Sequence, residues 1–195
     1  GISGQGVIVG NCDTGVDGTH PALQTRWRGY GGAHPWQECW YDALQTSTTP
    51  AATGSHGTHV MGTITGRGVS GTDTTWIGAA PGAQWIAARA IDTGRPLDSL
   101  ILDAFRAHQW FADPDGNPNT TEEIPDVVQN SWGVGDWHVG TDCYDYWNGV
   151  IQNLEAVGCV VTWSAGNEGP GAGTLRSPAI YELTSTTVFS VGAVN

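Results

Sequence analysis

Short apolar runs that alternate with amphipathic stretches are the feature that most constrains the fold of this chain. Five runs have the length and composition of buried strands, at residues 7–13, 84–91, 126–130, 159–163 and 188–194. Three stretches between them carry apolar side chains at helical spacing, at residues 56–64, 99–110 (with Ser99 as the candidate N-cap) and 144–157. Strands that alternate with helices pair in parallel through right-handed crossovers. The sequence therefore predicts an α/β fold: a doubly wound, mostly parallel sheet with helices on both faces.

The balance of residue types indicates a folded domain. Hydrophobic residues make up 39% of the 195 residues and charged residues 13%, whereas a disordered chain usually shows the reverse balance. A chain of this length can bury a sizeable core in one domain. Because no internal repeat or linker interrupts it, we expect residues 1–195 to belong to one domain.

The charge of the chain and the length of its apolar runs argue against two classes of partner. Its net charge is −12, and all seven of its basic residues are arginines. So acidic a chain repels phosphates, which argues against nonspecific binding of nucleic acid. No apolar run approaches the roughly 20 residues needed to span a bilayer. We therefore expect neither nucleic acid nor a membrane as a partner.

The four cysteines allow three full disulfide pairings. Cys12 and Cys159 lie in apolar runs, where buried free thiols are common. Cys39 and Cys143 lie in segments rich in Trp and Tyr that resemble loops, so they are the preferred pair if one bridge forms. No C-x-x-C pair occurs, which gives no support for a zinc site of that kind, and no metal ligands are expected from the sequence.

Three motifs carry residues suited to acyl-transfer chemistry. Asp13 follows the first predicted strand in Asp-Thr-Gly, His56 begins the first predicted helix in Gly-Ser-His-Gly-Thr-His, and Asn167 follows the fourth strand in Ser-Ala-Gly-Asn-Glu-Gly. The segment 131–133 follows the third strand. In an open parallel sheet, sites form at the carboxyl ends of the strands. We therefore expect these strand-end residues to meet at one edge of the sheet.

Each residue has a plainer interpretation and a chemical one. Alone, Asp13 is an ordinary turn residue, His56 a helix-start residue with local hydrogen bonds, and Asn167 a residue of a glycine-rich turn. Together they offer a buried carboxylate that orients a histidine, a general base for a hydroxyl nucleophile, and an amide donor for an oxyanion. The joint occurrence of all three motifs favours the chemical interpretation. His59 is expected to be structural.

With these motifs, the chain resembles the subtilase family over its whole length, and most of all its bacillopeptidase F-like branch. The supporting segments are residues 27–30, 39–43, 77–83 and 125–133. The resemblance implies a secreted serine endopeptidase that acts on polypeptides. It makes Asp13 the orienting acid, His56 the general base and Asn167 the oxyanion donor. It also implies that Ser131, Trp132 and Gly133 form one wall of the substrate groove, with residues near 93–97 opposite.

The chain departs from the family pattern at the nucleophile. No Gly-Thr-Ser-Met-Ala-like segment occurs before Asn195, so the resemblance implies a partial catalytic domain, with a sheet incomplete at its C-terminal side. We expect this chain alone to be inactive, and the missing part of the domain to be its partner, in cis or as a second chain. The chemistry needs no cofactor. Structural calcium is implied by the resemblance alone, since no calcium loop is recognisable.

The resemblance also yields a hypothesis about specificity. In the family, the segment after the oxyanion Asn lines the primary specificity pocket, and this register puts Arg176 at its base. A guanidinium there would pair with a Glu or Asp side chain of the substrate. Equally, Arg176 would turn to solvent or pair with Glu168 at the rim. Both alternatives stay open at this stage.

Two other functions compete with that of a peptidase. A catalytically silent relative would still bind extended peptides by strand addition, but it would need neither the acid, the base nor the amide donor. The ten tryptophans are also compatible with carbohydrate binding, although packing in the core and groove is the better explanation for them. The three motifs together favour the peptidase.

Overall fold

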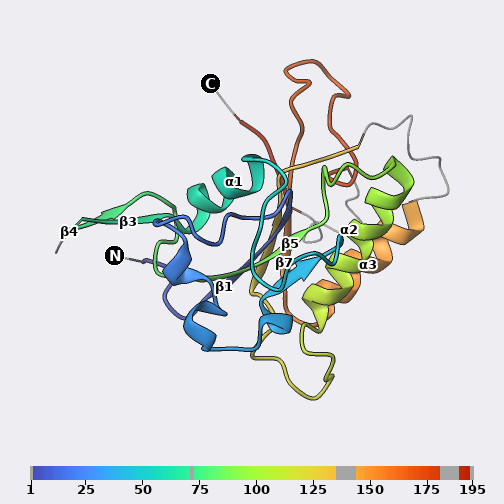
Figure 1. The fold of residues 1–195 in the computed structure, drawn as a ribbon. Helices are drawn as coiled ribbons and strands as arrows, with labels where there is room; N and C mark the ends of the chain where they lie inside the picture. Colours follow the sequence, from blue (N-terminus) through green and yellow to red (C-terminus); the bar gives the residue numbers. More distant parts are fainter. Residues whose placement is uncertain (1, 71–72, 135–143, 181–188, 194–195) are drawn as a thin grey trace.

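A computed structural model of the protein describes residues 2–70, 73–134, 144–180 and 189–193. Helix α1 (His56–Thr65) lies on one face of the central sheet. Helices α2 (Leu97–Ala112) and α3 (Tyr144–Ala156) pack together on the other face (Figure 1). The predicted α/β fold with helices on both faces is confirmed.

The central sheet has six strands, all parallel, in the order β2-β5-β1-β6-β7-β8. Their bounds are Trp40–Asp42 (β2), Gln84–Arg89 (β5), Ile8–Asp13 (β1), Val127–Asn130 (β6), Val160–Ser164 (β7) and Phe189–Val191 (β8). Strand β1 is central and pairs with β5 on one side and β6 on the other. The carboxyl ends of all six strands therefore meet at one edge, which we call the carboxyl edge.

Several short elements had no counterpart in the sequence prediction. A hairpin of β3 (Arg67–Ser70) and β4 (Asp73–Trp76) extends away from the body of the molecule (Figure 1). Strand β2 has only three residues, too few to show a periodic pattern. Three single 3₁₀ turns connect β1 to β2, at Gln24–Arg26, Tyr30–Gly32 and Trp36–Glu38.

Helix α2 begins earlier than the sequence analysis expected. Its first residue is Leu97, and its N-cap is Pro96, which makes no side-chain capping bond. Ser99 therefore lies inside the first turn, and its assignment as the N-cap was wrong. Pro96, with its fixed φ, leads into the helix, and Asp98 supplies a negative charge near the positive end of the helix dipole. None of the helices in the described ranges is long and apolar enough to cross a membrane.

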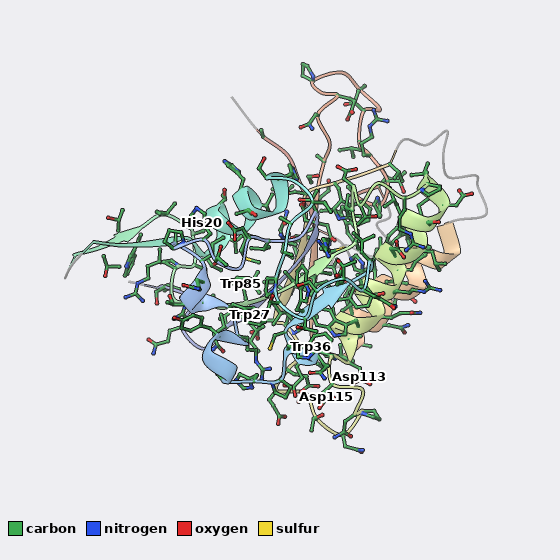
Figure 2. The ribbon with its side chains drawn as sticks, in the orientation of Figure 1. His20, Trp27, Trp36, Trp85, Asp113 and Asp115 are labelled. Atoms are coloured by element: carbon green, nitrogen blue, oxygen red, sulfur yellow. The ribbon has the colours of Figure 1, made fainter. Side chains whose placement is uncertain are left out.

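The core has two parts, one on each face of the sheet. The larger lies between the sheet and helices α2 and α3, where its bulkiest residues are Phe111, Trp147, Ile151, Leu154 and Trp163. The smaller one, on the side of α1, includes Leu23, Met61 and Trp85. Trp27 packs against it, with its ring tilted by 38° to that of Trp85 at a ring-centre distance of 6.4 Å (Figure 2). Most tryptophans in the described ranges thus pack in the core, as the sequence analysis preferred.

The preferred disulfide would join Cys39 to Cys143, a residue outside the described ranges. Cys12, Cys39 and Cys159 are all buried free thiols. The prediction for Cys12 and Cys159 agrees with this state. Cys39 does not belong to a surface loop, because it immediately precedes β2 and packs in the larger core. Burial raises the pKa of the Cys39 thiol to about 11.

Candidate active site

Asp13 is the last residue of β1, at the carboxyl edge, and its side chain is 1% exposed. Its main-chain oxygen accepts hydrogen bonds from the N–H groups of Ala90 and Ile91, at 3.0 and 3.1 Å, which anchor the strand end to the chain leaving β5. The N–H of Thr14 donates to Asp13 Oδ1 at 2.7 Å. The carboxylate is therefore fixed in position by its own backbone and by its neighbours.

His56 is the first residue of α1, and its ring faces Asp13 across the carboxyl edge. Nδ1 of His56 lies 2.8 Å from Oδ1 of Asp13, within the ~3.2 Å expected for an oriented acid–base pair. The side chain of His56 is 56% exposed. Among the described residues, no hydrogen bond engages Nε2. The ring is thus held at one nitrogen and accessible at the other.

Gly57 permits the close approach of α1 to the turn after β1. A Cβ atom at this position would lie 2.2 Å from the main-chain oxygen of Gly15 and 3.1 Å from Oδ1 of Asp13, so a side chain would displace one segment. The N–H of Gly57 also donates to Oγ1 of Thr14 at 3.0 Å. The glycine after the histidine is therefore required by the packing that sets the distance between the acid and the base.

The electrostatics of Asp13 favour a positive charge beside it. Burial raises the pKa of its carboxyl group above the ordinary value, although the hydrogen bonds from His56 and Thr14 partly oppose this shift. Oδ2 is buried and has no hydrogen-bond partner in the part of the chain that the structure describes. A buried carboxylate with one free oxygen gains most from a neighbouring cation. A proton that arrives on His56 supplies that cation.

A buried ion pair, which sequence reasoning missed, supports this strand end. Arg89 pairs with Asp13 in the register of β5 and β1, and its Nε and Nη2 donate to the two carboxylate oxygens of Asp42 at 3.0 and 2.6 Å. Both side chains are under 10% exposed. Asp42 also accepts N–H groups of the turn that follows it, from Leu44, Thr46 and Ser47. A lone arginine inside the apolar run 84–91 was the available signal.

The predicted groove residues line one cavity of about 490 Å³ at the carboxyl edge. Its lining includes all five residues that the sequence assigned to the oxyanion donor and the substrate groove: Ser131, Trp132, Gly133, Asn167 and Arg176. Asp13 and His56 do not line it. Asp13 is connected to it through Ile91, which lines the cavity and whose N–H donates to the main-chain oxygen of Asp13.

The wall opposite residues 131–133 differs from the expected range 93–97. Of that range only Leu97 lines the cavity. Ile91 and Asp92 precede it, and Leu100, Ile101 and Ala104 continue the wall along one face of α2. Because α2 begins at Leu97, the chain turns back towards the sheet earlier than expected, and an apolar helix face forms the wall.

Residues 131–134 are held rigidly beside the cavity. Nε1 of Trp132 donates to the main-chain oxygen of Cys12 at 2.8 Å, and the Trp132 ring packs edge-on against Trp163. Nε2 of Gln129 donates to Oγ of Ser131 at 2.6 Å. The N–H of Val134 donates to the main-chain oxygen of Ser177 at 2.9 Å. This segment is therefore tied to β1, to the core and to the chain after Asn167.

Arg176 pairs with Glu168 at the rim of the cavity, one of the two alternatives left open by the sequence. Nη2 of Arg176 lies 2.7 Å from Oε1 of Glu168, whose Oε2 accepts the N–H of Asn167 at 2.9 Å. The hydrogen bond from Arg176 lowers the pKa of Glu168 to about 2. The Arg176 stem passes so close to Gly133 and Gly166 that a Cβ at either would lie 2.7 Å from it. Gly166 also has a positive φ of +98°, which disfavours any other residue.

The described residues around Asp13 and His56 form no cluster of metal ligands. Within the described ranges, the single group of three or more His, Cys, Asp or Glu side chains close enough to share a cation consists of Asp113, Asp115 and Glu123. None of the three follows the carboxyl end of a strand.

The parallel sheet, with its histidine–aspartate pair at the carboxyl edge, agrees with the fold of subtilisin-like proteases. Solved structures support this fold: the S41 psychrophilic protease superimposes with a TM-score of 0.58 at 22% identity, and sphericase with 0.59 at 23%. Each superposition covers 91% of this chain and 51% of the other. The profile of the subtilase family matches residues 4–195, and the chain belongs to that family.

Three proteins of Bacillus subtilis (strain 168) show the same relationship in sequence. Bacillopeptidase F is 38% identical over 206 residues, covering all of this chain and 13% of the relative. Subtilisin E is 31% identical over 201 residues, covering 42% of the relative, and the minor extracellular protease Vpr is 31% identical over 197 residues, covering 21%. The predicted resemblance to the bacillopeptidase F-like branch is confirmed. The chain spans less than half the length of each of these relatives.

Proposed function

We propose that residues 1–195 form part of the catalytic domain of a secreted serine endopeptidase that hydrolyses polypeptides. The observation that carries this proposal is the contact of 2.8 Å between the buried Asp13 carboxylate and the accessible ring of His56. Membership of the subtilase family supports the reaction class. The name of the extracellular relative Vpr supports secretion.

In the proposed mechanism, each residue performs one task. Asp13 accepts the Nδ1–H of His56, which leaves Nε2 as the base that takes the proton of a serine hydroxyl. As the serine oxygen attacks the scissile carbonyl, Asp13 stabilises the imidazolium. The side-chain amide of Asn167 donates to the oxyanion of the tetrahedral intermediate. His56 then gives its proton to the leaving amine. Water attacks the acyl-enzyme by the same route, which releases the carboxylic acid product and restores the serine.

The proposal places the nucleophile outside these 195 residues, in a further segment or a second chain. Three serines near the site are poor substitutes. Ser131 accepts a hydrogen bond from Gln129, and Ser177 is buried. Ser164 lines the cavity, which Asp13 and His56 do not line. Strand β8 ends the sheet with Phe189 and Val191 more than half exposed. Such a surface is suited to packing against the rest of the domain.

Residues 131–133 supply the proposed peptide-binding wall, since they lie beside the cavity at the end of β6. An extended substrate would pair with this backbone by strand addition. A preference for acidic side chains stays a prediction. With Arg176 engaged by Glu168, a substrate carboxylate would have to compete for the guanidinium, so the expected preference is weaker than for an unpaired arginine.

The test uses the protein produced with its serine-bearing segment, in cis or added as a second chain. We expect it to cleave an unstructured polypeptide and to react with a fluorophosphonate probe. His56→Ala should abolish both, whereas His59→Ala, on the same helix and also exposed, should retain them. Asn167→Ala should lower kcat by roughly 100- to 1,000-fold, a range that subtilisin itself established.

The isolated 195-residue chain is the negative control, and it should neither cleave nor react. Probe labelling of Ser131, Ser164 or Ser177 in that chain would contradict the proposed source of the nucleophile. Peptide binding without cleavage by the assembled protein would instead favour a silent, peptide-binding relative. Equal activity of the wild type and His56→Ala would reject the peptidase mechanism altogether.

A further inference from the structure

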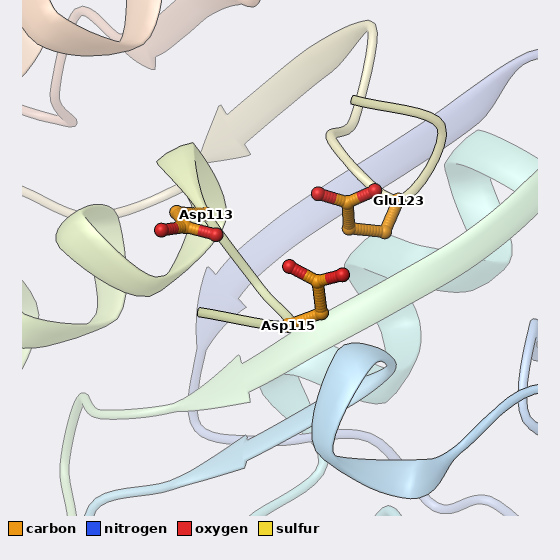
Figure 3. Close-up of side chains that lie close together, drawn as sticks. All are labelled: Asp113, Asp115 and Glu123. Carbon is orange, nitrogen blue, oxygen red and sulfur yellow. The ribbon is translucent and has the colours of Figure 1, made fainter. Parts of the chain in front are cut away.

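Three carboxylates converge at the amino-terminal edge of the sheet, away from the candidate active site. Asp113 follows the last turn of α2, Asp115 lies two residues further on, and Glu123 precedes β6. One oxygen from each lies within 4.8 Å of the others, and Figure 3 shows the three side chains turned towards one another. Figure 1 places the loop after α2 at the opposite end of the sheet from the segment after β7.

Glu123 is a buried acid without a partner. Its side chain is 2% exposed, and its Oε1 has no hydrogen bond within the part of the chain that the structure describes. Asp113 is partly exposed, but its Oδ1 atom is buried and likewise has no hydrogen-bond partner among the described residues. Burial raises the pKa of Glu123, and the negative charges of Asp115, Glu122 and Glu38 act in the same direction. An isolated buried carboxylate is costly unless a cation pairs with it.

The protein itself supplies no such cation among the described residues. In the described ranges, no ion pair joins an arginine to any of the three carboxylates, and Arg28 is engaged by Glu38. The last turn of α2 contains no basic residue either. Because the C-terminal end of a helix carries partial negative charge, three acids beside it repel both the helix and one another. The missing element of this site is a positive charge.

The loop that carries the acids is already organised around them. Oδ1 of Asp115 accepts the N–H of Asn117 at 2.7 Å, and its Oδ2 accepts the hydroxyl of Thr120 at 2.9 Å. These bonds hold the Asp115 carboxylate in place. Oxygen-bearing side chains also occupy every second position of the loop: Asp113, Asp115, Asn117, Asn119, Thr121 and Glu123.

We propose that Asp113, Asp115 and Glu123 bind a calcium ion. Hard cations take carboxylate and carbonyl oxygens, and nitrogen or sulfur ligands are absent from this group. Two oxygens on one Ca²⁺, each at about 2.3–2.6 Å, are at most about 5 Å apart, whereas Mg²⁺ at about 2.1 Å holds them within about 4.2 Å. The three ligand atoms all lie within 4.8 Å of one another, a spacing that calcium accommodates.

The position of the site indicates a structural role. The ion joins the C-terminal end of α2 to the residues that lead into β6, so it closes the loop between two elements of the core. It lies at the opposite edge from Asp13 and His56 and takes no part in the proposed chemistry. Calcium binding should therefore raise the temperature of unfolding without changing the Asp13–His56 pair.

The test compares calcium binding and thermal unfolding of the EDTA-stripped protein with those of three variants. By titration calorimetry, Glu123→Gln and Asp115→Asn should each bind one Ca²⁺ fewer than the wild type, or bind it at least tenfold more weakly. Glu122→Gln is the matched control, since it removes the same charge from an exposed neighbour, and it should bind as the wild type does. Calcium should raise the Tm of the wild type and of Glu122→Gln, and of neither other variant.

Folding of the variants is checked in EDTA. Without calcium, Glu123→Gln should unfold at the same temperature as the wild type or higher, because it removes a buried unpaired charge. Three outcomes would overturn the proposal: no effect of calcium on the wild type, equal calcium stoichiometry and affinity in the wild type and both site variants, or tighter binding of Mg²⁺ than of Ca²⁺. If Glu123→Gln fails to fold, Asp115→Asn, whose carboxylate belongs to the exposed loop, decides between these results.

Discussion

The two edges of the sheet handle buried carboxylates in different ways. At the carboxyl edge, Asp42 is neutralised by Arg89, and Asp13 faces a histidine that can accept a proton. At the amino edge, Glu123 lies beside two further acids with no basic partner among the described residues. A protein can therefore complete a buried acid from within its own chain or leave it for an external cation. The candidate active site uses the first solution, since in the proposed mechanism the charge on His56 appears and disappears during the reaction.

The sharpest way to break this comparison is Asp13→Asn in the assembled protein. The amide keeps the shape of the side chain, but it cannot hold His56 in the required tautomer, so kcat should fall roughly 10⁴-fold. Stability should not fall, because the substitution removes a buried charge whose carboxyl pKa is raised. Enzyme kinetics and urea unfolding of one preparation check both statements. A variant that keeps its activity, or that loses both stability and activity together, would make Asp13 a structural residue.

A second test removes the internal cation at the carboxyl edge. Arg89→Met leaves Asp42 buried without its partner, which should cost roughly 3–5 kcal/mol of the free energy of unfolding. Asp42 keeps its backbone hydrogen bonds to the following turn, so the loss should approach the lower end of that range. Urea unfolding measures the change, and added calcium should not restore it. Rescue by calcium would mean that the two edges are not distinct.

The smallest expected effect is the dependence of stability on pH, and it arises from a buried histidine. His108, on α2, is fully buried, stacks on Trp163, and has its pKa lowered by burial to about 4. The unfolded chain binds this proton near pH 6.5, so stability is fully present above that pH and falls as the pH drops from about 6.5 to 4. The total loss is about 3 kcal/mol, from the linkage between pKa and stability.

Urea unfolding at several pH values should show this loss in the wild type and not in His108→Leu. Glu123 should show the opposite dependence in EDTA, because its pKa is raised and stability is lost as the pH rises through its titration. The two opposite slopes therefore distinguish His108 in the core from Glu123 at the amino edge within one experiment. If stability depends on pH in the same way in the wild type and in His108→Leu, then His108 does not cause the loss of stability at acid pH.

The residues of the acid–base pair could be predicted from sequence because their motifs are rare and stand at predictable strand and helix ends. Asp13 ends a strand and His56 begins a helix, so connectivity alone brings them to one edge. Packing that depends on distant segments could not be predicted in the same way. Cys39 looked like a loop residue because β2 is three residues long, and the pairing of Arg176 with Glu168 depended on how the chain folds back after Asn167.

The loop after α2 shows the same limit. The run Asp-Pro-Asp-Gly-Asn-Pro has the turn chemistry of a solvent-exposed loop, and Asp115 is indeed exposed. What local sequence did not reveal is that Glu123, several residues later, is buried against the same loop. Alternation of oxygen-bearing residues from Asp113 to Glu123 was the available signal, and it departs from the spacing of an EF-hand, which places glycine at the sixth position.

The missing side chain at Gly57 has a mechanical consequence. The first turn of α1 rests directly on the main chain of Gly15, so at position 57 no side chain separates the helix from the turn after β1. A side chain with several rotamers between the two segments would let them shift, whereas direct contact between two backbones leaves them little freedom to move. Warming that loosens the surface should therefore leave the spacing of Asp13 and His56 almost unchanged until the whole domain unfolds.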